Sequence, residues 1–258
     1  MDKLKVKIEE ELRDFHGRFG LAIEIGPESF YVNSEGVFQS ASMIKVPILI
    51  EGFRQSEIGE LNVDQLVSIA NHVGGSGVLQ VFSREAQLTW KDLLTLMITV
   101  SDNTATNMLI DRLGMEAINS SFGKMGLQHT SLNRKMMDFE AIKQGLDNFT
   151  SPLDMLTCLK VIHEGPYLSE ESQAAALKIM SYQQFQDRLP GMMNLEKVFV
   201  ANKTGSLLHV EHDCAVITYK GKTAYAAVLM DRLDDVYTGK HKISRIGKHI
   251  YDYLLEES

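Results

Sequence analysis

The sequence predicts an α/β fold in which both ends of the chain build one antiparallel sheet and the middle forms an all-helical lobe. Segments with strand character are confined to about residues 19–40 and 198–230. Charged, amphipathic segments at the two chain ends predict N- and C-terminal helices that flank the sheet. Between them, residues 89–100 leave almost no polar helix face, which is typical of a helix buried in a large core.

Length and composition agree with this architecture. The 258 residues, 44% of them hydrophobic, suffice for a full core in a single domain. We expect two lobes within it. Residues 1–40 together with 190–258 form the α/β lobe, and residues 41–189 form the helical lobe.

Charge and hydropathy exclude several kinds of partner. The net charge of −8 argues against a nucleic-acid partner. No run reaches the ~20 apolar residues of a membrane-spanning helix. The first 15 residues lack an apolar signal-peptide core, so we expect a cytoplasmic protein if Met1 is the native start. Cys158 and Cys214 are too few for a disulfide framework, and we expect two free core thiols. The oligomeric state is not predicted.

The elements follow in order from local patterns. An amphipathic helix over residues 1–15 precedes strands at 19–25 and 29–32 and a third strand ending at Ser40, an antiparallel meander. Helices are expected at about 41–53, 89–100, 104–113, 115–125, 151–164 and 169–180, then a strand at 198–205, a hairpin of 215–219 with 224–230, and a helix at 236–255. Residues 74–77, Gly-Gly-Ser-Gly, favour a plain connector over a cleft-edge loop. Residues 126–150 form a long connection, a kind of segment that is often functional.

The pattern Ser42-x-x-Lys45 suits a nucleophile and its base. It begins the apolar helix that follows Ser40, and residues three apart share a helix face at about 5–6 Å between Cβ atoms. A serine hydroxyl needs a neighbouring base, and a desolvated lysine can lose its charge and serve as one. An ordinary buried helix containing a serine and a lysine is the alternative.

Two further segments fall where the lobes should meet. Ser101-Asp102-Asn103 forms a polar corner between two helices, where Asp102 by itself is best explained as a helix cap. Lys203-Thr204-Gly205 ends a predicted strand. Clefts between lobes are common ligand sites, so these segments and Ser42 are expected to form one.

These three motifs, in this order, resemble the signature of class A β-lactamases and penicillin-binding proteins. The resemblance extends over most of the chain and makes residues 1–258 one β-lactamase-like catalytic domain. It implies a serine hydrolase that forms an acyl-enzyme with a small-molecule substrate, a β-lactam or a peptide-like amide or ester. It implies no cofactor, and antibiotic resistance as the role associated with such activity.

The resemblance also implies a role for each matching residue. Ser42 is the acylated nucleophile, and Lys45 either takes its proton or keeps the site poised electrostatically. Ser101 relays a proton to the leaving nitrogen. Lys203 lies near Ser101 and supplies positive charge.

Substrate-binding roles are implied in the same way. Asn103 donates to an amide carbonyl of the substrate, and Thr204 helps Lys203 to bind a carboxylate. Gly205 lets the strand approach the substrate, and the backbone N–H groups of Ser42 and Ser206 form the oxyanion hole. Asn107 resembles the asparagine that holds the long loop in this family.

Two positions depart from the family pattern. Aligned on Arg134, the loop glutamate that activates the deacylating water is replaced by Met136, and methionine cannot activate water. Asp138 and Glu140 are candidate bases, although both are better explained as solvated loop charges. The arginine that usually binds the substrate carboxylate from the next strand is also missing, and Glu211 or His212 occupies that region.

A metal site is considered and not expected. His209, Glu211, His212 and Asp213 are all ligand types, but their spacing suits a helix and the segment is predicted to be a turn and strand.

Three functions therefore remain. The first is a serine hydrolase that is acylated at Ser42 by a β-lactam and releases the product slowly. The second is an esterase, amidase or D-Ala-D-Ala-type peptidase with a non-antibiotic substrate, which the missing glutamate favours. The third is a non-catalytic binding protein, which three intact motifs argue against.

Overall fold

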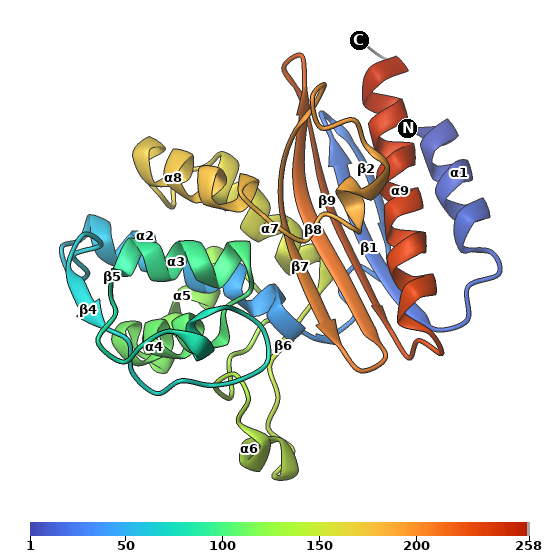
Figure 1. Cartoon of the computed structure of the whole chain (residues 1–258). Coiled ribbons are helices and arrows are strands. Elements are labelled where there is room, and N and C mark those ends of the chain that lie inside the picture. The colour runs from blue at the N-terminus through green and yellow to red at the C-terminus, as the bar shows by residue number, and fades with distance from the viewer. Residues whose placement is uncertain (257–258) are drawn as a thin grey trace.

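A five-stranded antiparallel sheet carries α1 and α9 on one side and the helical part of the chain on the other (Figure 1). The computed structural model describes residues 1–256. The strands lie in the order β2-β1-β9-β8-β7. Their bounds are β1 (Arg18–Ile25), β2 (Glu28–Val32), β7 (Phe199–Leu207), β8 (Val210–Tyr219) and β9 (Lys222–Asp231). The predicted fold class, with strands from both chain ends in one sheet, is confirmed.

The remaining elements lie mostly between β2 and β7. The helices are α1 (Asp2–Leu12), α2 (Lys45–Glu57), α3 (Trp90–Thr99), α4 (Asn103–Leu113), α5 (Met115–Met125), α6 (Phe139–Lys143), α7 (Pro152–His163), α8 (Glu170–Ser181) and α9 (Val236–Glu256). Three 3₁₀ turns are η1 (Ala41–Ile44), η2 (Leu79–Val81) and η3 (Leu189–Met192). Short strands are β3 (Phe38–Gln39), β4 (Leu66–Ser68), β5 (Gln87–Thr89) and β6 (Phe149–Thr150).

The sheet separates two hydrophobic cores because successive side chains of a strand point to opposite faces. On β1, Leu21 and Ile23 pack with α1 and α9, whereas Ala22 belongs to the core of the helical part. On β9, Val228 and Leu229 divide in the same way. Both faces of the central strands are thus buried, and the sheet forms a layer between the two cores.

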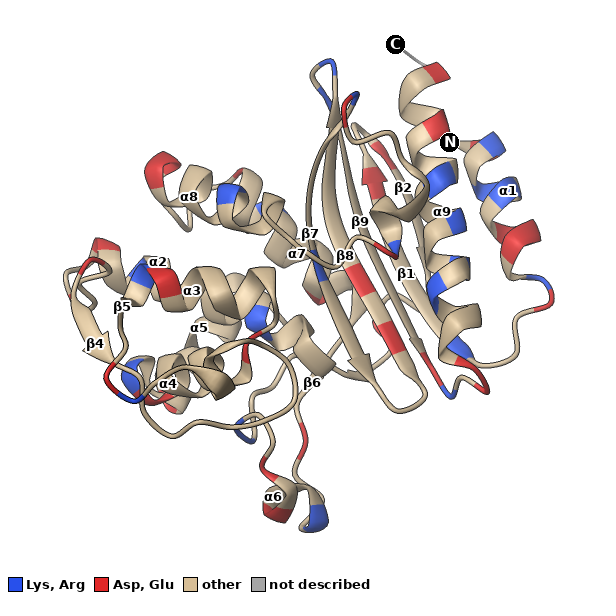
Figure 2. Cartoon of the chain, viewed as in Figure 1, with Lys and Arg blue, Asp and Glu red and all other residues tan. Residues whose placement is uncertain are grey.

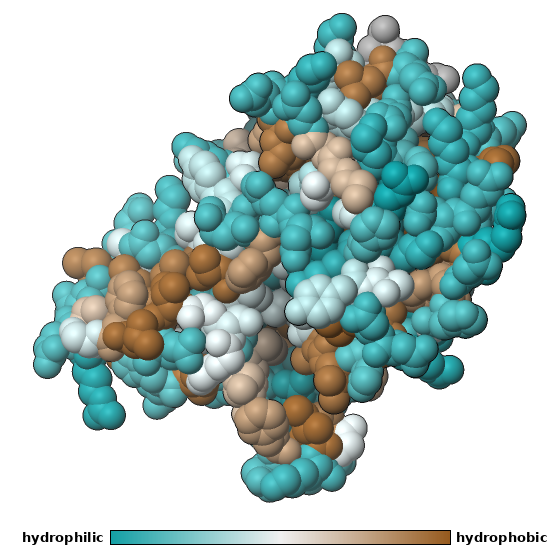
Figure 3. Space-filling view, turned by 45° about the vertical axis from the view of Figure 1, so that its right-hand side comes forward, coloured by the Kyte–Doolittle hydropathy of each residue, from teal (hydrophilic) through white to brown (hydrophobic). Residues whose placement is uncertain are grey.

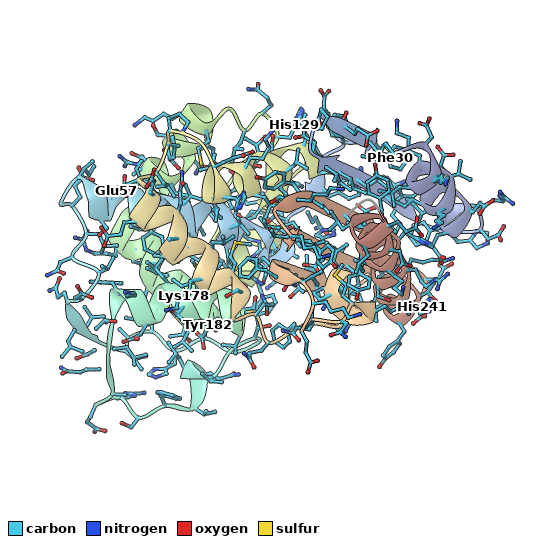
Figure 4. All side chains as sticks on the ribbon, turned by 90° about the horizontal axis from the view of Figure 1, so that it is seen from above. Phe30, Glu57, His129, Lys178, Tyr182 and His241 are labelled. Carbon is cyan, nitrogen blue, oxygen red and sulfur yellow. The ribbon has the colours of Figure 1, made fainter. Side chains whose placement is uncertain are left out.

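The two helices that cover the outer side of the sheet are rich in charged residues. α1 and α9 carry several charged residues each (Figure 2). Seen from above, Glu57 marks the far end of the helical part and His241 marks α9 at the opposite end (Figure 4).

Cys158 and Cys214 are buried and free, as the sequence predicts.

Two strand predictions need correction. The third strand of the N-terminal meander does not join the sheet; β3 pairs with β6, and Ser40 N–H donates to the Asn148 carbonyl at 2.8 Å. The chain leaves the sheet edge after β2, so its backbone groups find partners in the long loop. The hairpin of β4 with β5 was not predicted, because its three paired positions are short and largely exposed.

Helix ends follow capping rules. Thr89 and Asp92 form a reciprocal capping box at the start of α3. Asp102 accepts a hydrogen bond from Ala105 N–H and caps α4, as expected. Ser151 caps α7, whose first residue is Pro152.

The contact of α9 with η3 leads to a stability prediction. A Cβ at Gly247 would lie 2.0 Å from the Leu189 carbonyl oxygen, whereas a Cβ at Gly123 on α5 would meet nothing within 4 Å. We expect Gly247→Ala to lower the free energy of unfolding by about 1–3 kcal/mol through overpacking. Gly123→Ala should raise it by roughly 0.5–1 kcal/mol, because alanine loses less backbone entropy on folding. Urea unfolding of both variants checks this, and equal effects would contradict the packing of η3 on α9.

Candidate active site

Ser42 lies in the 3₁₀ turn η1, one residue before the apolar run that enters α2. The prediction placed it in the first turn of the α-helix, but α2 begins at Lys45. Ala41 has a φ of 46°, in the left-handed region that non-glycine residues rarely adopt. This turn sets the direction from which Ser42 leaves the backbone.

Lys45 joins three segments of the chain. Its side chain is completely buried, and Nζ lies 3.1 Å from Ser42 Oγ and 3.0 Å from Ser101 Oγ. It also donates to the Ser101 carbonyl at 2.8 Å and to Asn103 Oδ1 at 3.0 Å. A buried amine with only neutral oxygen partners within hydrogen-bond distance is poorly stabilised as a cation.

Ser101 lies between both lysines and Ser42. Its hydroxyl donates to Ser42 Oγ at 2.7 Å, and Lys203 Nζ donates to Ser101 Oγ at 3.2 Å. Ser101 has a φ of 55°, a second left-handed residue in the site. The four side chains that sequence analysis singled out therefore form one hydrogen-bonded network.

Burial changes the protonation of both lysines. The pKa of Lys45 is well below its ordinary value, first because of desolvation and then because of the nearby Lys203 charge. Burial lowers the pKa of Lys203 to about 7, although Asp213 acts in the opposite direction. Burial thus biases Lys45 toward the neutral amine, whose lone pair can take a proton.

Asp102 does more than cap α4. Its Oδ2 accepts hydrogen bonds from the N–H groups of Val78 at 2.7 Å and Leu79 at 2.8 Å. A Cβ at Gly77 would lie 2.2 Å from that oxygen, so only glycine fits there. The glycine-rich loop is thereby held against α4. Because Gly75 and Ser76 line the cleft, the expectation of a plain connector was wrong.

The expected substrate-binding residues surround the network. Asn103 Nδ2 donates to the Gly74 carbonyl at 3.1 Å, and Thr204 lines the cleft beside Ser42. A Cβ at Gly205 would lie 3.3 Å from Ser42 N, so glycine lets β7 pack closely on η1. The hydroxyl of Ser206 contacts Arg188 and Glu211.

Hydrogen bonds and an ion pair fix the long loop around Arg134 and Met136, and Met136 lies in the cleft. Asn107 binds the backbone of Met136 twice, from Nδ2 to the carbonyl at 3.0 Å and from Met136 N–H to Oδ1 at 2.7 Å. The buried Arg134 forms an ion pair with the partly buried Asp147 at 2.7 Å. Met136 lines the same hollow as Ser42 and Asn103. The contact expected of Asn107 with the loop is therefore present.

The two candidate carboxylates of the loop have other partners. Asp138 caps the short helix α6 through Ala141 N–H at 3.0 Å. Glu140 is exposed and forms an ion pair with Lys143 at 2.7 Å. Neither side chain lines the hollows beside Ser42.

Sequence reasoning missed Arg188, which precedes η3. Its Nε donates to Glu211 at 2.7 Å, Nη2 contacts Glu211 and Ser206 Oγ at 2.5 Å each, and Nη1 donates to Asp187 at 2.5 Å. An arginine therefore lines this cleft from a segment outside β8. No local pattern around residue 188 indicates this, because the contact forms only when η3 packs on the sheet.

The residues considered as metal ligands have separate partners. The His209 ring contacts the Leu233 carbonyl, and Asp213 accepts from Leu189 N–H and Asn202 Nδ2. His212 is buried between Met230 N–H and the Gln39 carbonyl, and burial lowers its pKa to about 4, so its ring is neutral. Within residues 1–256, no group of three or more His, Cys, Asp or Glu side chains is arranged to hold a metal ion.

The cleft has two adjoining hollows that share Ser42, Ser76 and Ser206. One, of about 180 Å³, extends past Asn103 to Met136 and α6, and the other, of about 210 Å³, extends past Ser101 to Arg188 and Lys240. A larger hollow of about 570 Å³ lies at the far end of α7 and contains none of the network residues. We place the site in the smaller hollows because both contain Ser42, the partner of the perturbed Lys45.

Apolar side chains line the first hollow. Met137, Phe139 and Ile142 are contributed by the loop and α6, and Leu207 by the end of β7. Figure 3 shows apolar side chains on the segment that projects at the bottom of the view and on the surface next to it. The side of the cleft near Asn103 therefore suits an apolar group.

The fold and this cleft define a class of α/β proteins in which a serine and two lysines form one network between an antiparallel sheet and the helical part of the chain. A β-lactamase from Sphaerobacter thermophilus is 30% identical, with a TM-score of 0.91 over 99% of this chain and 98% of that one. PBP-A is 28% identical, with a TM-score of 0.89 over 99% and 97%, and a mutant of it was solved as an acyl-enzyme complex with penicillin G. A β-lactamase of Rhodobacter capsulatus is 26% identical over 86% of this chain and 77% of its own length.

The sequence pattern of the Beta-lactamase enzyme family matches residues 3–254, and the chain belongs to that family. Family and fold together support a β-lactamase-like hydrolase. Across residues 1–256 no helix has the length and apolar character needed to cross a bilayer.

The buried amine of Lys203 predicts how stability changes with pH. In the unfolded chain this lysine stays protonated up to about pH 10, whereas in the folded protein it loses its proton near pH 7. Between these values the unfolded state binds more protons, so this group makes the folded protein more stable as the pH rises. From pH 7 to 9, wild type should gain about 2 kcal/mol relative to Lys203→Met.

Urea unfolding at both pH values measures this difference. Lys178→Met serves as the matched control, because Lys178 is exposed on α8 and its ammonium stays in water in both states. A difference between wild type and Lys203→Met that does not change with pH would show that the Lys203 amine keeps its charge when buried.

Proposed function

We propose that this protein is a serine hydrolase that is acylated on Ser42 by a β-lactam or a related amide, and that hydrolyses the acyl-enzyme slowly. The observation that supports this most is the network in which Lys45 Nζ and Ser101 Oγ both lie within 3.1 Å of Ser42 Oγ. A nucleophile hydrogen-bonded to a neutral amine is the arrangement that acyl transfer needs.

In the acylation step, Ser42 Oγ attacks the carbonyl carbon and its proton passes to Lys45. The bond from that carbon to the leaving nitrogen then breaks, and Ser101 Oγ delivers a proton to the nitrogen. Lys45 or Lys203 returns a proton to Ser101, since both nitrogens lie within 3.2 Å of its hydroxyl. General acid–base help of this kind is typically worth ~10²–10⁴ in rate.

The developing oxyanion is stabilised by the backbone N–H groups of Ser42 and Ser206. The close packing at Gly205 supports this assignment, because it brings β7 directly against η1. Backbone donors are already oriented in the folded protein, so they need no reorganisation when negative charge develops on the substrate oxygen.

Release of the acyl group requires a water molecule and a base. Met136 lines the hollow that contains Ser42, and a thioether is only a weak acceptor. Asp138 and Glu140 are engaged elsewhere. We therefore propose that Ser42 keeps its acyl group much longer than an enzyme with a carboxylate at this position.

A second candidate is an esterase, amidase or D-Ala-D-Ala-type peptidase whose natural substrate is not an antibiotic. Met136 and the similarity to PBP-A, a mutant of which was solved with penicillin G attached, favour it. Both candidates use the same acylation chemistry and differ in the substrate and in the lifetime of the ester. The third alternative, a non-catalytic binding protein, does not explain why two lysines are buried beside Ser42.

Acylation can be tested with penicillin G and intact-mass spectrometry. We expect the mass of one opened penicillin on wild type, and none on Ser42→Ala, which lacks the attacking oxygen. Peptide mapping should place the adduct on Ser42. Labelling that persists in Ser42→Ala would overturn the assignment of the nucleophile, and no adduct with no turnover would favour the non-catalytic alternative.

Deacylation can be tested by placing a carboxylate in the loop. We expect Met136→Glu to speed the loss of the adduct by roughly tenfold or more, because it supplies a general base beside the ester. Leu146→Glu is the matched control, since it adds the same charge to an exposed position of the same loop. Decay of the adduct mass over time gives both rates. Rapid hydrolysis by wild type that survives Asp138→Asn and Glu140→Gln would show that another group activates the water.

A further inference from the structure

Arg188 lines the hollow that contains Ser101, and its charge is already paired with a carboxylate of the protein. Arg188 is 5% exposed at its side chain and Glu211 is 3% exposed, and the two form a buried ion pair. Every nitrogen of the guanidinium contacts an oxygen of the protein: Nε and Nη2 contact Glu211, Nη2 also contacts Ser206, and Nη1 contacts Asp187. Little donor capacity remains for a substrate.

The other charges near this hollow also balance. Lys240 donates to Asp187 at 3.0 Å, so two cations face two carboxylates. Lys203 donates to the Thr204 carbonyl at 2.7 Å, and burial lowers its pKa to about 7. A site built to attract an anion keeps an excess of positive charge, and this one does not.

Arg188 could bind a substrate carboxylate only by releasing Glu211. That would leave the Glu211 carboxylate buried without its partner, which is strongly unfavourable. An uncharged substrate meets no such obstacle. The hollow on the Asn103 side also favours an uncharged substrate, because its lining is apolar. The apolar residues there are Met136, Met137, Phe139, Ile142 and Leu207.

We propose that Glu211 occupies the place of a substrate carboxylate on Arg188, and that the protein therefore selects uncharged esters or amides with an apolar acyl group over carboxylate-bearing ones. Glu211 is then a specificity-determining residue. The inference rests on the proposed acyl transfer at Ser42 and names its substrate class.

The covalent step is ordinary hydrolysis and needs no further reactant than water. Ser42 Oγ bonds to the acyl carbon while the bond to the leaving oxygen or nitrogen breaks, and the serine proton ends on that leaving atom. Water then replaces Ser42 on the acyl carbon, which gives the free acid and restores the hydroxyl.

A competition experiment tests the preference. Equal amounts of penicillin G and its methyl ester, which differ only at the carboxylate, are mixed with wild type, and intact-mass spectrometry gives the ratio of the two Ser42 adducts. We expect the methyl ester adduct to predominate. In Glu211→Gln, which frees Arg188, the ratio should move toward the acid by roughly tenfold or more, as for a charge-assisted hydrogen bond.

Two further variants identify the cause. Glu171→Gln removes one negative charge from the exposed start of α8 and should leave the ratio within about threefold of wild type. The double variant Arg188→Met with Glu211→Gln removes both buried charges, a change that often preserves folding, and should return the ratio to about that of wild type. These two results together would show that the Arg188–Glu211 pair, and not the net charge of the protein, sets the preference between the two compounds.

The outcomes separate the two proposals. Adducts in which wild type prefers the acid, or an unchanged ratio in Glu211→Gln, overturn the role of Glu211 and leave acyl transfer intact. No adduct from either compound overturns acyl transfer itself. If Glu211→Gln does not fold, the wild-type ratio and the double variant decide.

Discussion

The buried amine of Lys45 is the constraint on which the rest of the site depends. It has no exposed surface, and its hydrogen-bond partners come from η1 and from the α3–α4 corner. Because a buried ammonium among neutral oxygens is costly, the surroundings favour the neutral amine, and Lys203 on β7 strengthens that preference. The same contacts hold η1 against the α3–α4 corner, and Lys203 connects this network to the sheet through Ser101.

Much of this arrangement could be predicted from the sequence, and the reasons are local. The motifs at Ser42 and Ser101 lie where helices begin or end, so their place in the cleft followed from the expected topology. The motif at Lys203 was expected to end its strand, but β7 continues to Leu207 and Lys203 lies in its middle. The capping by Asp102 followed from its position before α4. The contact of Asn107 with the loop followed from resemblance alone, because nothing in its neighbourhood indicates a partner 29 residues away.

What could not be predicted depends on packing between distant segments. The left-handed backbones of Ala41 and Ser101 are not favoured by their residue types, and they persist because the surrounding contacts require them. Arg188 reaches the cleft only through the packing of η3 on α9 and β8. The hydrogen bond from Val78 N–H to Asp102 Oδ2, at 2.7 Å, attaches the glycine-rich loop to α4 and could not be predicted from the sequence.

The position of β1 inside the sheet also governs when the protein matures during synthesis. β1 lies between β2 and β9, so a chain emerging from the ribosome presents β1 with one neighbour and an unpaired edge until β9 is made. Lys203 arrives with β7, shortly before β9. The helical segments can collapse on one another early, but the amine network closes only when nearly the whole chain is out. An incompletely translated chain therefore carries Ser42 without the environment that makes it reactive, and leaves an edge of the sheet exposed to wrong pairing.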